Sequence, residues 1–129
     1  MKKIMMTAVA AICLAGGALA DPLEGLWQTA KDDNGNFGHV QVAPCGAALC
    51  GTLVKSFDAS GSEIASEFTG RNIISETTAN GDGAYRGKVY APDRDKTYNS
   101  RLQLSGNSLA VSGCVLGICR EGGNWTRVQ

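Results

Sequence analysis

Apolar and polar residues alternate along several short segments of this chain, and clusters of Gly, Asn and Asp separate the segments. In residues 38–43, Val40 and Val42 share one face, and polar side chains occupy the other. The same two-residue period recurs in residues 84–90 and 97–104. This period is typical of a β-strand with one buried and one exposed face. No stretch has the apolar spacing of a long amphipathic helix.

The alternating segments predict about eight short strands with no helix to cross between parallel neighbours. Regularly spaced short strands of this kind form a barrel or a sandwich. We expect an all-β fold, an up-and-down antiparallel β-barrel of about eight strands. The strands are expected at residues 25–29, 38–43, 51–57, 71–75, 84–90, 97–104, 109–112 and 124–128.

The two tryptophans lie in the first and the last of these strands. If the meander closes, the two strands pair, and Trp27 comes near Trp125 and Arg127. Closure of this kind removes the exposed edges of the sheet. Gly122 and Gly123, just before the last strand, indicate a bulge or bend.

Two connections are rich in polar residues and glycine. Residues 58–70 form a long loop, with a short helical turn expected around residues 62–68, and such a loop often covers one mouth of a small barrel. The orientation of Ile64 and Phe68 in this loop then separates two functions. Inward side chains favour a ligand, and an exposed patch favours a protein partner. Residues 77–83 are expected to form a cluster of turns.

The first 20 residues have the pattern of a cleaved Sec signal peptide. Lys2 and Lys3 precede an apolar core, and Ala18-Leu19-Ala20 provides a small-x-small cleavage site. Cys13 lies within the apolar core; lipid anchoring through it is an alternative, disfavoured because Ile12 precedes it. We expect residues 21–129 to form one exported domain, periplasmic or secreted, with no membrane span.

Charge excludes some partners. Without Lys2 and Lys3, 10 basic residues face 12 acidic ones, a net charge of about −2. A nucleic acid or an anionic membrane surface is therefore not expected as the main partner.

Four cysteines remain after the signal, and they repeat one spacing: Cys45 and Cys50, then Cys114 and Cys119. An even count in a small exported domain indicates two disulfides. Each pair flanks four residues that we expect to form a hairpin loop, so local bonds are favoured over the other two connectivities. A zinc site of four thiolates is the alternative, but the usual C-x2-C spacing is missing.

Several short motifs resemble known families. Gly25-x-Trp27 near the start and Arg127 in the closing strand resemble the lipocalin and calycin signature, which implies that the Arg side chain lies across the Trp and closes the barrel. Taken with Cys45-Gly46-x3-Cys50-Gly51 and Trp125-Thr126-Arg127, the pattern is similar to exported bacterial proteins of domain of unknown function 2147. That resemblance implies a small lipocalin-like β-barrel without an assigned activity.

A closed barrel with interior aromatics suits a small, partly apolar or lipophilic ligand. The candidate ligand-binding residues are Trp27, Tyr85, Tyr98 and Trp125. An interior filled entirely by side chains is an equal alternative, since short strands enclose little space. A second hypothesis is a protein-interaction module, such as an inhibitor or accessory factor of an envelope enzyme, with contacts from residues 58–70 and 81–83.

Enzymatic activity is not expected. His39 is the only histidine, no Gly-x-Ser-x-Gly motif occurs, and the disulfides leave no free thiol in residues 21–129. We therefore expect no catalytic residue, no metal ligand and no cofactor.

Overall fold

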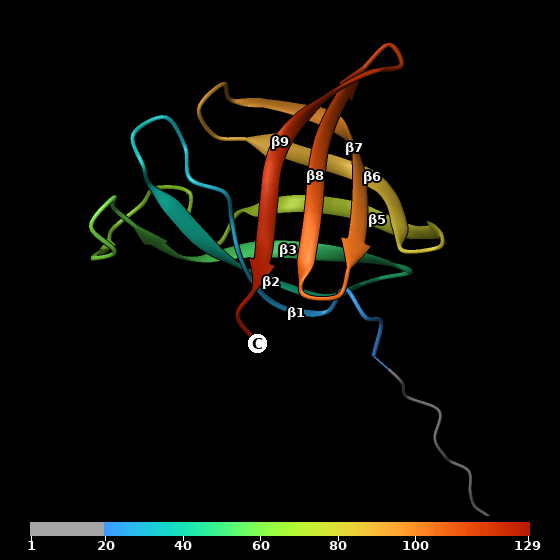
Figure 1. Ribbon diagram of the computed structural model, residues 1–129, viewed down its shortest axis with the longest axis horizontal. Coiled ribbons are helices and arrows are strands. Elements are labelled where there is room, and N and C mark those ends of the chain that lie inside the picture. The colour runs from blue at the N-terminus through green and yellow to red at the C-terminus, as the bar shows by residue number, and fades with distance from the viewer. Residues whose placement is uncertain (1–19) are drawn as a thin grey trace, which may run out of the picture.

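The computed structural model describes residues 20–129, which form nine β-strands (Figure 1). The expected signal segment lies outside the described residues, apart from Ala20. Within the described part, no helix is long and apolar enough to cross a membrane. The strands are β1 (Gly25–Gln28), β2 (Phe37–Cys45), β3 (Ala48–Phe57), β4 (Glu63–Ile64), β5 (Asn72–Gly81), β6 (Ala84–Ala91), β7 (Lys96–Ser105), β8 (Ser108–Val115) and β9 (Ile118–Arg127).

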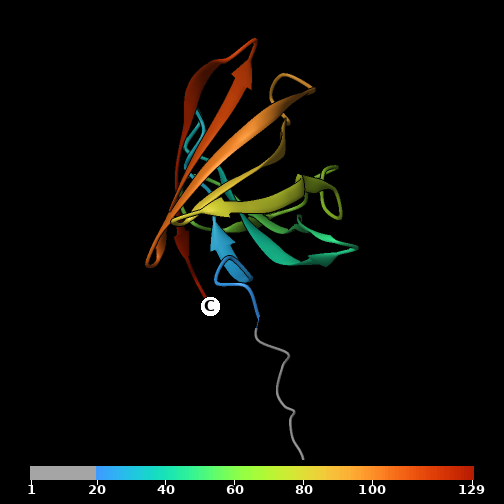
Figure 2. The same cartoon turned by 90° about the vertical axis from the view of Figure 1, so that its right-hand side faces the viewer.

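Eight of the nine strands form a closed antiparallel barrel, in which each strand pairs with its neighbours along the chain. β1 makes the closure, because it pairs with β2 on one side and with β9 on the other; Trp27 lies opposite Arg127. β4 is a two-residue strand that pairs with the end of β3. The expected up-and-down barrel is therefore confirmed. Figures 1 and 2 show β8 and β9 crossing β3 and β5 steeply.

Two irregular segments differ from expectation. Residues 77–83 are not a cluster of turns, because β5 continues to Gly81 and only Asp82 and Gly83 turn the chain into β6. The last four residues of β5 are exposed, so apolar alternation stops before the strand does. The helical turn expected in residues 62–68 is also wrong, because β4 lies there and pairs with β3. The bulge at Gly122 is present: the β8–β9 register shifts opposite it.

Successive connections of the meander lie at alternate ends of the barrel. The closed end carries residues 21–24, the turns after β2, β5 and β7, and the C-terminus. The open end carries the loops at residues 29–36, 58–71 and 92–95 and the turn between β8 and β9. Figure 1 shows the β8–β9 turn at the top and the C-terminus at the bottom.

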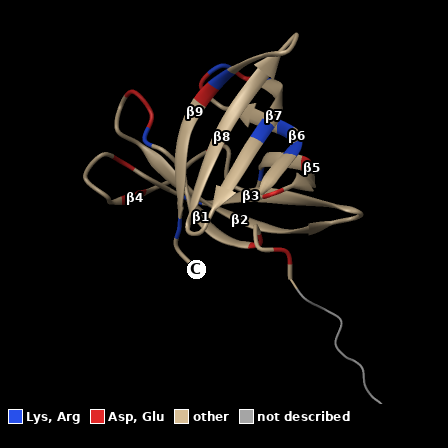
Figure 3. Cartoon of the chain, turned by 45° about the vertical axis from the view of Figure 1, so that its right-hand side comes forward, with Lys and Arg blue, Asp and Glu red and all other residues tan. Residues whose placement is uncertain are grey.

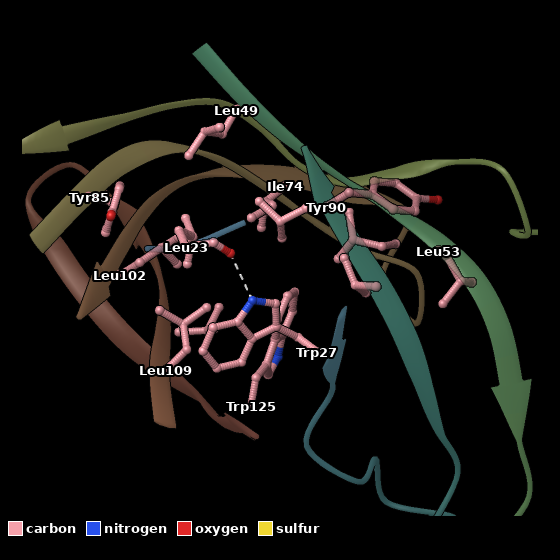
Figure 4. Close-up of a cluster of buried hydrophobic side chains, with 14 residues drawn as sticks. Leu23, Trp27, Leu49, Leu53, Ile74, Tyr85, Tyr90, Leu102, Leu109 and Trp125 are labelled. Carbon is pink, nitrogen blue, oxygen red and sulfur yellow. Dashed lines mark hydrogen bonds between the residues drawn. The ribbon is translucent and has the colours of Figure 1, made fainter. Parts of the chain in front are cut away.

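The hydrophobic core fills the closed end. Leu23, Trp27, Leu102 and Leu109 have no exposed surface, and Figure 4 shows them gathered around the Trp27 indole. Gly51 lets strand β3 approach this core closely. A Cβ atom at Gly51 would lie 2.7 Å from side-chain carbons of both Val40 and Ile74. Strand β3 therefore packs tightly between β2 and β5 at this point.

Both local disulfides are present, Cys45–Cys50 at the closed end and Cys114–Cys119 at the open end. The hairpins that they brace are tighter than expected, since each turn has two residues rather than four. Cys114 lies directly opposite Cys119. Cys45 instead lies opposite Ala48, so its bond to Cys50 joins diagonal neighbours across the two strands.

Candidate functional site

Contacts between the first strand, the last strand and residues 21–24 seal the closed end of the barrel. The guanidinium of Arg127 lies over the Trp27 ring, 4.4 Å from its centroid. The same guanidinium donates hydrogen bonds to the carbonyl oxygens of Glu24 and Pro22, at 2.9 and 2.5 Å. Trp27 Nε1 donates to the Leu23 carbonyl at 2.9 Å. These contacts tie the first and last strands to residues 21–24, so this end is a structural plug.

Tyr85 belongs to the same plug. Its side chain is 4% exposed, and its hydroxyl donates to Asp21 Oδ1 at 2.5 Å. Burial, together with the hydrogen bond and the negative charge of Asp21, raises the pKa of Tyr85 to about 12. Tyr85 is therefore neutral at physiological pH and holds the N-terminal segment against the barrel.

A cavity of about 1210 Å³ occupies the open end, and its surrounding loops contribute to its lining. Ligand pockets of drug-sized molecules span roughly 300–1,000 Å³, so the space is sufficient for a small ligand. Trp125 is 4% exposed and belongs to the core, and it also lines the cavity, which makes it the boundary between the two. Four other strands each contribute an apolar residue to the wall: β3 contributes Leu53, β5 Ile73, β6 Val89 and β8 Val111.

One side of the cavity is built by the long loop at residues 58–71. Phe68 points inward: it packs against the core, and its ring lies 6.2 Å from the Tyr90 ring. The Arg71 guanidinium covers the Tyr90 ring at 3.7 Å, and the Tyr90 hydroxyl donates to Asp95 Oδ1 at 2.7 Å. That hydrogen bond is the main reason why the pKa of Tyr90 is raised. The loops on this side are therefore attached to the barrel wall.

Charged residues of both signs surround the mouth. The pKa of Arg94 is raised, first by a side-chain hydrogen bond with Tyr98 and also by the negative charge of nearby Asp93. Figure 3 shows acidic and basic residues mixed over the loops of the open end. Away from the mouth, Arg86 on β6 lies directly opposite Arg101 on β7 on the outer face of the barrel. This pairing was not predicted from the sequence. The charged residues that line the cavity mouth are Lys31, Asp32, Asp33, Asp93, Arg94, Arg120 and Glu121.

One polar atom lies unpaired in the barrel interior. Ser100 is 4% exposed. Within residues 20–129, its hydroxyl is the one buried side-chain polar group that makes no hydrogen bond. Ser100 lies between Gly87 and Gly113 on the neighbouring strands, and Gly113 lines the cavity. Tyr98, two residues before Ser100 on β7, also lines the cavity. The Ser100 hydroxyl is therefore next to residues of the cavity wall, although Ser100 itself does not line the cavity.

The four expected ligand-binding aromatics do not form one group. Tyr98 and Trp125 line the cavity, whereas Trp27 and Tyr85 lie in the plug at the other end. Phe68 was expected to point inward if the barrel holds a ligand, and it does line the cavity, whereas Val89 was not among the expected ligand-binding residues. Alternation placed Val89 on the inner face with Tyr85, but it carries no information on depth along the strand.

The histidine of this sequence, His39, is not among the residues that line the cavity. His39 lies beside Phe57, with the ring centroids 4.7 Å apart, on the outer face of β2. Burial and the nearby positive charge of Lys55 lower its pKa, so it is neutral near pH 7. No group of three or more potential metal-ligating side chains occurs in the part of the chain that the structure describes.

Comparisons agree with this architecture. A solved structure titled "Protein HP1028 from the human pathogen Helicobacter pylori belongs to the lipocalin family" superposes with a TM-score of 0.64 at 19% identity, over 85% of each chain. No curated protein matches the sequence. A family described as "Uncharacterized protein conserved in bacteria (DUF2147)" matches residues 25–127, nearly all of the barrel. The chain therefore belongs to this DUF2147 family and folds as a lipocalin-like β-barrel.

Proposed function

We propose that this protein is an exported binding protein that holds a small, partly apolar ligand in the open end of its barrel. The cavity of about 1210 Å³ is the observation that carries the proposal. The open half has apolar walls from β3, β5, β6 and β8, and the wall residues Leu53, Ile73 and Val111 are themselves members of the hydrophobic core. Such walls contribute about 25 cal/mol for each Å² of apolar ligand surface removed from water.

Polar groups in and around the cavity support a ligand that is only partly apolar. The Ser100 hydroxyl, next to the cavity wall, has no hydrogen-bond partner within residues 20–129. A buried polar group without a hydrogen bond costs about 1–3 kcal/mol, and a ligand oxygen or nitrogen that reaches it recovers part of that cost. Tyr98 and Arg94 offer further polar contacts at the mouth.

Export is part of the proposal. Two disulfides within a small barrel are consistent with an oxidising compartment, either the periplasm or the exterior of the cell. The signal-like pattern of residues 1–20 supports the same location.

The ligand function is preferred to the two alternatives. Of the two loop residues expected to separate these functions, Phe68 packs inward, which favours a ligand, whereas Ile64 is 37% exposed at the cavity mouth. The two segments expected to contact an envelope enzyme also lie at opposite ends of β5, so they cannot form one surface. An enzymatic role is not proposed, because the only histidine lies on the outer face.

Two measurements test the binding function. Native mass spectrometry of protein purified from its own cell envelope, followed by solvent extraction, identifies a co-purifying ligand. Fluorescence titration with N-phenyl-1-naphthylamine, a neutral apolar probe, measures binding directly. We expect Val89→Trp, which fills the cavity, to weaken binding at least tenfold. Val54→Trp is the matched control, because Val54 is 41% exposed and outside the cavity lining. Equal binding by both variants, or none by the wild type, would refute the proposal.

A further inference from the structure

Exposed apolar side chains gather around the mouth of the cavity. Of the six large hydrophobic residues that are exposed within residues 20–129, four line the cavity and its mouth. Clusters of exposed apolar residues mark interaction sites, whereas isolated ones need no explanation. The four residues are Ile64, Val115, Leu116 and Ile118.

Three of the four form the tip of the β8–β9 hairpin, and the fold gives no reason for their presence. Leu116 is 96% exposed and has a positive φ of 52°, with Gly117 at 82°. Left-handed backbone at both turn positions favours Asn, Asp or Gly, and it disfavours Leu. The β5–β6 turn has nearly the same geometry, with φ angles of 55° and 80°, and there the residues are Asp82 and Gly83.

The hairpin tip is braced by a disulfide and is continuous with the cavity wall. The Cys114–Cys119 disulfide joins directly opposite residues just behind the tip. On the same strand, Val111 and Gly113 line the cavity. An apolar surface therefore runs from the exposed tip along β8 into the barrel.

We propose that the hairpin tip, residues 115–118, inserts into the surface of a lipid bilayer and holds the cavity mouth against it. The tip is a narrow projection of a few apolar side chains, whereas a specific protein interface needs about 20–30 residues on each side. Insertion to the depth of the headgroup boundary suits such a projection. The mouth carries charges of both signs, which complements zwitterionic headgroups, and the net charge of about −2 without residues 1–20 disfavours an anionic surface.

Docking in this orientation gives an apolar ligand a path that avoids water. A molecule that leaves the bilayer beside the tip meets Val111 and then the interior walls. This second step rests on the proposed ligand-binding function, whereas docking itself rests only on the tip.

Flotation with phosphatidylcholine vesicles tests the inference. We expect the wild-type protein to float with the vesicles and Leu116→Asn to bind at least tenfold more weakly, because Asn suits the turn and removes the apolar side chain. Val128→Ser is the control: Val128 is 42% exposed but belongs to the closed end, so binding is expected to be unchanged. Adding phosphatidylglycerol is expected to give no tighter binding.

Any other result of the flotation experiment overturns the inference. Wild-type protein that stays unbound, or that floats as well after Leu116→Asn, excludes docking through the tip. A concentration-dependent dimer in ultracentrifugation that Leu116→Asn dissociates, without vesicle binding, assigns the tip to a second copy instead. The naphthylamine titration separates the two proposals. Probe binding without vesicle binding retains the ligand function alone, and vesicle binding without probe binding retains docking alone.

Discussion

The Arg127 guanidinium lies 4.4 Å from the centre of the Trp27 ring, across the seam where the last strand closes on the first. The indole is fully buried, and the guanidinium covers it from outside while it donates to two carbonyl oxygens of residues 21–24. One side chain therefore joins the seam, the core and the N-terminal segment. The other end of the barrel carries the cavity.

Replacing Arg127 is expected to loosen this plug. Arg127→Ala removes a cation–π contact of about 0.5–2 kcal/mol and the hydrogen bonds to two carbonyl oxygens, of which that of Glu24 is partly buried, so we expect a loss of about 2–3 kcal/mol in unfolding free energy. Arg127→Lys keeps the charge without the planar fork, and an intermediate loss is expected. Urea unfolding followed by tryptophan fluorescence measures both, with Arg86→Ala as an exposed control. A loss below about 0.5 kcal/mol in Arg127→Ala would contradict the structural role.

Tyr85 makes the stability sensitive to alkaline pH. Its folded-state pKa is raised from 10 to about 12, so the neutral form stabilises the fold fully below pH 10. Above pH 10 the unfolded chain ionises first, and the contribution is lost as the pH rises toward 12. A single group of this kind removes about 1 kcal/mol for each pH unit in that window.

The comparison with Tyr85→Phe isolates this effect, because Phe retains the ring but cannot ionise or donate to Asp21. Urea unfolding between pH 8 and pH 11.5 is the measurement. We expect the stability difference between the two proteins to be constant below pH 10 and to shift against the wild type above it. Parallel curves throughout would show that Tyr85 does not titrate with unfolding.

Close packing at Gly51 predicts a large effect from one added methyl group. Gly51→Ala places a Cβ atom 2.7 Å from carbons of Val40 and Ile74, and overpacking of this kind costs about 1–3 kcal/mol. Gly122→Ala is the matched control, since its Cβ would make an ordinary contact of 3.4 Å. Thermal unfolding of the two variants provides the test. Equal melting temperatures would show that the core at β3 can expand.

The barrel and its disulfides could be predicted because both depend on local spacing. A period of two identifies the buried face of each strand, and the repeated spacing of Cys45–Cys50 and Cys114–Cys119 brings each pair together across a hairpin. The end of β5 was missed because its residues are exposed and polar, and only its pairing with β6 holds it extended.

The location of the site could be predicted only in part. Alternation assigns Tyr85 and Val89 to the same inner face, but Tyr85 lies in the plug and Val89 in the cavity wall. Depth along a strand depends on where the whole barrel is filled, and here that is decided by Leu23 and Trp27, which fill one end. A pattern confined to single strands carries no such information.

The two disulfides are expected to differ in function but not in their effect on stability. Each closes a loop of similar length, so replacing either pair with Ala costs about 2 kcal/mol by loop-closure entropy. Only the Cys114–Cys119 pair braces the hairpin tip. Chemical denaturation and phosphatidylcholine flotation of the two double variants are the measurements. Vesicle binding is expected to weaken in Cys114→Ala/Cys119→Ala and to remain in Cys45→Ala/Cys50→Ala; the reverse pattern would contradict the role given to the tip.

The turn at Leu116 predicts a substitution that stabilises the fold while it removes an interaction. Leu116 gains almost nothing from burial and has a backbone conformation that Asn tolerates far better, so we expect Leu116→Asn to raise the unfolding free energy by about 1 kcal/mol. The reciprocal change, Asp82→Leu, places Leu in the same geometry at the closed end and is expected to lower it by a similar amount. Urea unfolding measures both. If Leu116→Asn is destabilising instead, the Leu116 side chain stabilises the hairpin itself. Its exposure is then no evidence that it binds a lipid bilayer.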